Sequence, residues 1–140
     1  MVQLVRLWRK NPGIRQFAAS IVQGLPQGDA SAEVRALHVF VRDKIRYTND
    51  IRNVETLQTP QATLEMGVGD CDDKTILLAS LLESIGRTTR IVAVALGGGP
   101  YSHVVPEVKL GTKWYMLETI KPVEAGWSPN GITKRMTAHV

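Results

Sequence analysis

The chain has 140 residues, of which 44% are hydrophobic and 21% are charged. These fractions match those of ordinary globular proteins and exclude a disordered, collagen-like or coiled-coil chain. The 17 basic and 13 acidic side chains leave a net charge of +4. No uninterrupted apolar run reaches the roughly 18 to 20 residues that a membrane-spanning helix requires, so we expect a single domain that does not cross a membrane.

The basic side chains are concentrated at the N-terminus, where Arg6, Arg9, Lys10 and Arg15 precede the first acidic residue, Asp29. Such a segment is either a solvated helix face or a surface that contacts nucleic acid or an acidic partner. The segment does not resemble a basic stripe interleaved with aromatic residues. We therefore favour the solvated face and expect no nucleic-acid partner.

Cys71 is the only cysteine, which excludes an intrachain disulfide and a cysteine-rich zinc site. The first ten residues contain no apolar run of signal-peptide length. We therefore expect a cytoplasmic or virion-associated protein that keeps its thiol reduced. The chemistry predicted below needs neither a metal nor an organic cofactor.

Two helices are predicted in the first third of the chain. Apolar residues recur at helical spacing over 13–23, and again from an N-cap at Asp29 or Ser31 to a helix end near Tyr47. His38 lies beside the apolar stripe of the second helix, which favours a packed, hydrogen-bonded histidine over a catalytic one.

Two further helices are predicted on either side of a glycine-rich segment. Thr59 and Pro60 are typical of an N-cap and a first helical residue, and Gly67 closes the short helix that they begin. A longer helix follows Cys71, is apolar on all sides, and ends at Gly86, which is well suited to a C-terminal cap. Its uniform hydrophobicity predicts burial at the centre of the domain.

The rest of the chain has the pattern of strands. The predicted strands are 88–96, 103–110 and 113–120, with a turn at Gly111 and Thr112 between the last two. Pro106 cannot donate a ladder hydrogen bond, which favours an edge position for its strand. Helices followed by strands indicate an α+β fold with an antiparallel sheet. We expect a core over about 30–124, a helical arm over 1–28 and an irregular tail over 125–140.

The sequence around Cys71 predicts a reactive thiol. The cysteine lies directly before the most hydrophobic helix, where unpaired backbone N–H groups and the helix dipole favour the thiolate. The same N–H groups can stabilise an oxyanion when the thiolate attacks a carbonyl. The carboxylates of Asp70, Asp72 and Asp73 oppose the thiolate only weakly if exposed, and the last two can instead cap the helix. The alternative is a buried cysteine that acts as a small hydrophobic side chain.

A thiolate of this kind needs a histidine in contact with it. We expect that histidine to be His103, which opens a strand after a glycine-rich loop. A two-residue turn at 111–112 would place His103 opposite Ile120 and make Glu118 its diagonal neighbour on the same face of the sheet. Glu118 would then accept the imidazole Nδ1–H and leave the other ring nitrogen for the thiol.

Six segments occur in a specific order and spacing: Val41–Tyr47, Glu55–Pro60, Gly69–Thr75, Leu82–Gly86, Ser102–Val104 and Lys113–Glu118. Together, over about 34–124, they resemble the bacterial and phage branch of the transglutaminase-like superfamily. The resemblance implies a single transglutaminase-like domain with a papain-like α+β fold and its nucleophile at the start of a central helix. In that family the roles of nucleophile, base and orienting acid map onto Cys71, His103 and Glu118. The family acid is most often aspartate, so the glutamate departs from the pattern.

We therefore expect a cysteine-dependent acyl-transfer enzyme that acts through a thioester on peptide or side-chain amides of a protein or peptide substrate. Water resolves the thioester in a protease or amidase, and an amine resolves it in a transglutaminase. Hydrolysis is favoured because the chain lacks the extra domains of calcium-dependent cross-linking enzymes. The Cys71 N–H and a second donor, Tyr47 or Gln58, would form the oxyanion hole. The alternative is a non-catalytic interaction module of a phage or bacterial assembly.

Overall fold

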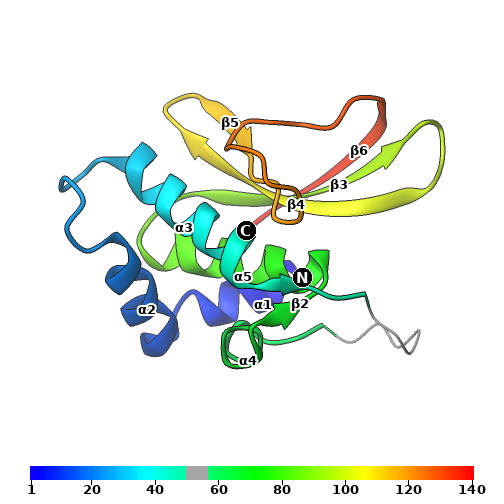
Figure 1. Cartoon of the computed structure of the whole chain (residues 1–140). Coiled ribbons are helices and arrows are strands. Elements are labelled where there is room, and N and C mark those ends of the chain that lie inside the picture. The colour runs from blue at the N-terminus through cyan, green and yellow to red at the C-terminus, as the bar shows by residue number, and fades with distance from the viewer. Residues whose placement is uncertain (50–56) are drawn as a thin grey trace.

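The computed structural model describes residues 1–49 and 57–140, so Glu55 and Thr56 of the second motif segment lie outside the described residues. The helices are α1 (Val2–Trp8), α2 (Pro12–Val22), α3 (Ala30–Lys44), α4 (Pro60–Met66) and α5 (Cys71–Ser84). The strands are β1 (Arg46–Tyr47), β2 (Val68–Gly69), β3 (Thr89–Leu96), β4 (Tyr101–Leu110), β5 (Lys113–Met116) and β6 (Ile132–His139). Figure 1 shows the helices gathered on one side of a four-stranded sheet, and this sheet is antiparallel. The predicted α+β class is confirmed.

Helix α5 lies at the centre of the core. Every residue from Asp73 to Leu82 is buried, because α1 to α4 contact it on the helical side and β3 and β4 cover it from the sheet. A helix that is apolar on all faces requires such surroundings. Gly86, just past its C-terminal end, has φ +89° and lets the chain turn away toward β3. The predicted central helix and its glycine stop are confirmed.

The N-terminal helices belong to the hydrophobic core. Val5 of α1 is fully buried, and Ile14 and Ala18 of α2 join the apolar cluster on α5. The Arg9 guanidinium also donates to the Glu83 carboxylate of α5 at 3.0 Å. The predicted core boundary near residue 30 is therefore wrong, because the apolar faces of α1 and α2 cover one side of the central helix.

Local capping residues explain where the other helices begin. The side chain of Asp29 accepts from the Ala32 N–H at the start of α3, and Thr59 accepts from the Ala62 N–H at the start of α4. Both predicted N-caps are confirmed. Helix α3 ends at Lys44, earlier than the predicted end near Tyr47. The reason is that Arg46–Tyr47 leave the helix and pair in parallel with Val68–Gly69.

The sheet has the strand order β5-β4-β3-β6. Its fourth strand corrects the prediction of an irregular tail, which is wrong over Ile132–His139. Backbone pairing holds β6 along β3, from His139 opposite Arg90 to Ile132 opposite Leu96. The connection 117–131, orange in Figure 1, carries the chain from the β5 edge of the sheet to the opposite edge.

Pro106 determines where β5 ends. Strand β4 lies between β5 and β3, so the expectation of an edge strand is wrong. In the β4–β5 register, Glu107 faces Met116 and the next pair is Pro106 with Leu117. The Leu117 N–H donates to the Pro106 carbonyl at 2.9 Å, but the proline has no N–H with which to return the bond. The ladder stops there, and the predicted strand 113–120 is shortened to Lys113–Met116.

Within residues 1–49 and 57–140, no helix has the length and hydrophobicity needed to span a bilayer.

Candidate active site

Cys71 is the first residue of α5, so its half-buried sulfur lies at the positive end of the helix dipole. The Asp70 side chain accepts from the Asp73 N–H at 2.9 Å, and the Asp73 side chain accepts from the Asp70 N–H at 3.2 Å. This reciprocal pair is a capping box. The sequence prediction gave the cap to Asp72 and Asp73, whereas the N-cap is Asp70 and Asp73 completes the box.

Asp73 also ties the preceding loop to the helix start. Its carboxylate is only 4% exposed and accepts from the Gln58 N–H at 2.8 Å. Burial raises the pKa of Asp73 to about 6, although the bonds from the Gln58 and Asp70 N–H groups act to lower it. Gly69 permits this close packing, because a Cβ at that position would lie 2.8 Å from the Cβ of Asp73. The backbone around Cys71 is therefore fixed from both sides.

His103 lies on β4 opposite Val94, beside a register shift between Val94 and Ala95 of β3. Bulges of this kind redirect side chains near functional sites. Interactions of the imidazole with Cys71 and with Glu118 raise the pKa of His103 to about 9 against the opposing effect of burial. The ring is therefore an imidazolium at neutral pH.

Glu118 is 2% exposed. Its Oε2 accepts from His103 Nε2 at 2.7 Å, and its Oε1 accepts from the Ile120 N–H at 2.9 Å. Burial acts to raise the pKa of Glu118, but these hydrogen bonds outweigh burial and hold the pKa below its ordinary value. The carboxylate is thus hydrogen-bonded to the imidazole in a pocket that Cys71 also lines.

The predicted register holds only as far as the hairpin extends. Leu110 faces Lys113 across the two-residue turn, as expected. The expected pairing of His103 with Ile120 is absent, because β5 ends at Met116. Glu118 reaches His103 from the connection that follows β5, and it bonds to Nε2. The expectation that Nδ1 bonds the carboxylate is wrong, and Nδ1 is the nitrogen left for Cys71.

Two buried polar residues that the sequence did not assign to the site support it. His38, predicted as a packed histidine, is 1% exposed, and its Nε2 donates to the backbone carbonyl of Glu118 at 2.6 Å. Burial lowers the pKa of His38, which keeps this ring neutral. Lys74 is 1% exposed and donates to the carbonyls of Ile45 at 2.6 Å and Arg42 at 3.2 Å. It thereby fixes the end of α3 beside the start of α5.

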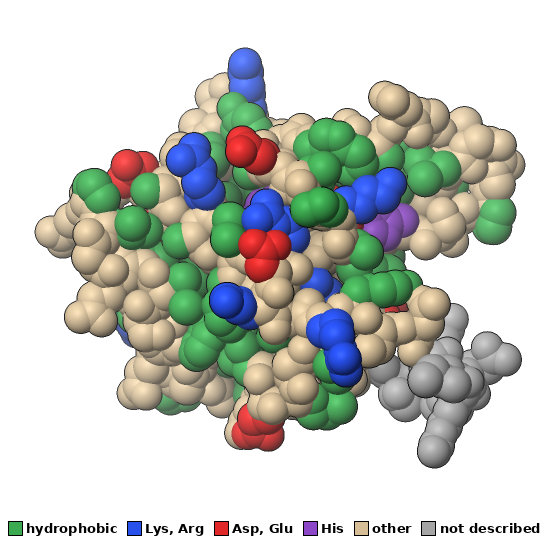
Figure 2. Space-filling view, in the orientation of Figure 1, with side chains coloured by type: hydrophobic (Ala, Val, Ile, Leu, Met, Phe, Trp, Pro, Cys, Tyr) green, Lys and Arg blue, Asp and Glu red, His purple; other side chains and the backbone are tan. Residues whose placement is uncertain are grey.

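Cys71, His103 and Glu118 line one pocket of about 240 Å³. Figure 2 shows a hollow at the right of the displayed face, between the sheet and the helices, where histidine, basic and hydrophobic side chains adjoin. Tyr47 lines the same pocket, and its hydroxyl bonds to Asn49. Gln58 does not line it: the side-chain oxygen of Gln58 accepts from the Thr63 hydroxyl at 3.0 Å. In the part of the chain that the structure describes, no three potential ligands are grouped as a metal site would require.

The family model of the transglutaminase-like superfamily matches residues 15–119. The chain therefore belongs to the transglutaminase-like superfamily. Comparison with curated proteins by sequence gives no match. The papain-like α+β fold expected from the sequence is confirmed by the similarity of the chain to solved structures.

Three solved structures share this fold. A candidate protease of Parabacteroides distasonis matches with a TM-score of 0.65 and 14% identity, over 83% of this chain and 25% of that one. A candidate cysteine protease of Cytophaga hutchinsonii matches with a TM-score of 0.62 and 14% identity, over 91% of this chain and 51% of that one. Legionella pneumophila LapG matches with a TM-score of 0.61 and 16% identity, over 85% of this chain and 72% of that one. This chain therefore spans about a quarter of the length of the Parabacteroides protein and about half of the length of the Cytophaga protein.

Proposed function

We propose that this member of the superfamily is a thiol hydrolase that cleaves peptide or side-chain amides through a thioester, with Cys71 as nucleophile. The observation that carries the proposal is the hydrogen bond between His103 and the buried Glu118 carboxylate in the pocket that Cys71 lines. The pocket thus brings together a candidate nucleophile, a candidate base and a buried group that orients the base. Membership of a superfamily whose structural relatives include candidate cysteine proteases supports the same reaction class.

In the first half of the reaction the Cys71 thiolate attacks the substrate carbonyl carbon and forms an S–C bond. Negative charge moves to the carbonyl oxygen, where the Cys71 N–H at the helix tip can stabilise it. The tetrahedral intermediate collapses, the C–N bond breaks, and His103 gives its Nδ1 proton to the leaving amine. The product is a thioester on Cys71 with a neutral imidazole beside it.

In the second half a water molecule attacks the thioester carbonyl while His103 takes its proton. The S–C bond then breaks, and the carboxylic acid leaves as the sulfur regains its negative charge. Glu118 stays ionised throughout and stabilises the imidazolium at the start and end of the cycle. An amine in place of water would give the transglutaminase outcome from the same intermediate.

p-Nitrophenyl acetate tests this proposal without a known substrate, because an activated ester acetylates any competent thiolate. We expect release of p-nitrophenol and a transient mass increase of one acetyl group on Cys71. Acetylation should be lost in Cys71→Ala and slowed about a hundredfold or more in His103→Ala. His139→Ala is the matched control, since that histidine is exposed on β6 and does not line the pocket.

The fate of the acetyl group separates the two acyl acceptors. Acetate as the product in the presence of added methylamine supports hydrolysis, whereas N-methylacetamide as the main product would indicate amine transfer. If wild type and His103→Ala acetylate equally slowly, the proposed hydrolase is wrong and the non-catalytic interaction module becomes the better interpretation.

A further inference from the structure

The pocket beside Cys71 has apolar walls drawn from separate parts of the chain. Tyr47 comes from β1, Leu96 from the end of β3, and Ile120, Trp127 and Pro129 from the connection 117–131. Tyr47 and Leu96 are 43% and 39% exposed, so an incoming ligand can reach their apolar surface. These side chains surround the thiol with low-dielectric material, in which a nearby charge is screened less than in water.

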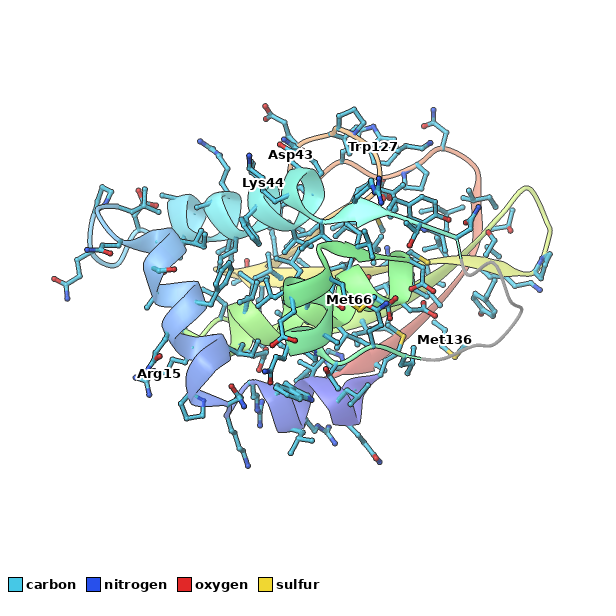
Figure 3. The ribbon with its side chains drawn as sticks, turned by 60° about the horizontal axis from the view of Figure 1, so that its bottom comes forward. Arg15, Asp43, Lys44, Met66, Trp127 and Met136 are labelled. Atoms are coloured by element: carbon cyan, nitrogen blue, oxygen red, sulfur yellow. The ribbon has the colours of Figure 1, made fainter. Side chains whose placement is uncertain are left out.

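One cation faces this apolar pocket from the same connection. Lys121 is exposed and lines the pocket, and its Nζ lies 5.5 Å from the centre of the Trp127 ring. Figure 3 shows Trp127 on the connection that follows β5. Among residues 1–49 and 57–140, no carboxylate lies within ion-pairing distance of Lys121 Nζ. The aromatic contact therefore holds an ammonium at the pocket rim without neutralising it.

The Glu118 carboxylate does not cancel this charge for an incoming ligand. Its two oxygens are occupied by His103 and by the Ile120 N–H, and it is 2% exposed. Of the described residues that line the pocket, Lys121 and His103 carry positive charge and Glu118 is acidic, whereas the Asp72 carboxylate, which lies 3.8 Å from the Cys71 sulfur, does not line it. Electrostatic complementarity in an apolar cleft favours ligands of the opposite sign.

We propose that the pocket takes acyl donors that carry a carboxylate or another anionic group beside an apolar group, and that Lys121 is the residue that selects the negative charge. This inference rests on the proposed function, because it assigns a substrate class to the same thiol. Lys121 acts on the substrate through its side-chain charge, whereas the Glu118 carboxylate is held by His103 and the Ile120 N–H. Substitution of the side chain therefore leaves the support of the carboxylate in place.

Iodoacetate and iodoacetamide are matched probes of this selectivity. In both reactions the Cys71 sulfur forms a bond to the CH₂ carbon and iodide leaves, but only iodoacetate carries a carboxylate. The measured quantity is the ratio of the two second-order alkylation rates at low ionic strength. We expect Lys121→Met to lower this ratio about three- to tenfold, since a charge that lines a partly apolar pocket contributes roughly that much. Lys121→Arg should keep the ratio.

Lys113→Met is the matched control, because this exposed lysine lies at the far end of the β4–β5 hairpin and does not line the pocket. It makes the same change in net charge and should leave the ratio unaltered. Added salt should lower the wild-type ratio toward that of Lys121→Met. Equal ratios in wild type and Lys121→Met would overturn the selectivity. Rates no faster than those of a free thiol with both reagents would instead overturn the proposed function on which it rests.

Discussion

Replacing Glu118 with glutamine isolates the effect of the negative charge beside His103. The variant Glu118→Gln keeps the size of the side chain and one acceptor oxygen. The native carboxylate serves two donors, His103 Nε2 at 2.7 Å and the Ile120 N–H at 2.9 Å. An amide has one oxygen and one NH₂ group, so one of these donors loses its partner in a buried place.

The size of the effect follows from the hydrogen bonds. A bond to a charged group contributes about 1.5–3 kcal/mol, and a tenfold change in proton affinity corresponds to about 1.4 kcal/mol. The interaction with Cys71, which is the largest cause of the raised pKa of His103, remains in the variant. We therefore expect the pKa of His103 to fall by about 1 to 2 from its wild-type value of about 9.

Stability should change with a definite dependence on pH. The pKa of His103 lies above its ordinary value of 6.5, so its interactions stabilise the folded state fully below pH 6.5. That contribution is lost as the pH rises through about 9. The free energy of unfolding of Glu118→Gln should therefore be lower than that of wild type at pH 6, and the difference should shrink toward pH 10.

Proton NMR titration of the imidazole rings measures this pKa directly. The chain has three histidines, and the signal lost in His103→Ala assigns the ring of interest. Glu118→Asp is the control, because it keeps the charge and should retain most of the raised pKa. An unchanged pKa of His103 in Glu118→Gln, with a full rate of acetylation by p-nitrophenyl acetate, would refute the orienting role of Glu118.

Three further predictions concern the residues that position the site. Lys74→Ala should lower the free energy of unfolding by about 2–4 kcal/mol, because it opens a cavity and removes the donor to two carbonyls. Lys44→Ala, on the exposed end of α3 (Figure 3), should change it by less than about 0.5 kcal/mol, and equal losses in the two variants would contradict this account. Burial lowers the pKa of His38 below 6.5, so the unfolded state binds more protons than the folded state as the pH drops below 6.5, and stability falls there. In His38→Gln this fall in the free energy of unfolding below pH 6.5 should be absent. A fall that persists in the variant would rule out His38 as its source. Gly69→Ala should lower stability by about 1–3 kcal/mol and slow acetylation, since its Cβ would lie 2.8 Å from the Cβ of Asp73; an unaltered melting temperature would argue against this close packing.

The elements that local chemistry specifies were predictable from the sequence. Thr59 and Asp29 cap their helices through N–H groups three residues away, so their roles follow from short-range geometry. Cys71 precedes an apolar helix in the sequence and starts that helix in the structure. The pairing of Leu110 with Lys113 likewise follows from a two-residue turn.

The features that sequence reasoning missed depend on contacts between distant segments. Strand β6 is almost wholly exposed, so it has no alternating pattern and is fixed only by pairing with β3. His38 bonds to a carbonyl 80 residues away, and Lys74 to carbonyls about 30 residues away. Every residue has a backbone carbonyl, so the sequence does not show which carbonyl will accept such a bond. Pro106 did carry a signal, since its missing N–H interrupts the hydrogen bonds between two strands. Interpreting that signal required the order of the strands in the sheet, which depends on contacts between distant segments.

The rate of Cys71 alkylation by iodoacetamide between pH 5 and pH 10 tests the central claim most directly. If an imidazolium holds the sulfur as a thiolate, the wild-type rate should already be high well below pH 8, where a free thiol of pKa about 8.5 reacts slowly. His103→Ala should remove this low-pH reactivity and leave a rate that rises only above pH 8. Wild-type and His103→Ala profiles that coincide would contradict the thiolate–imidazolium pair.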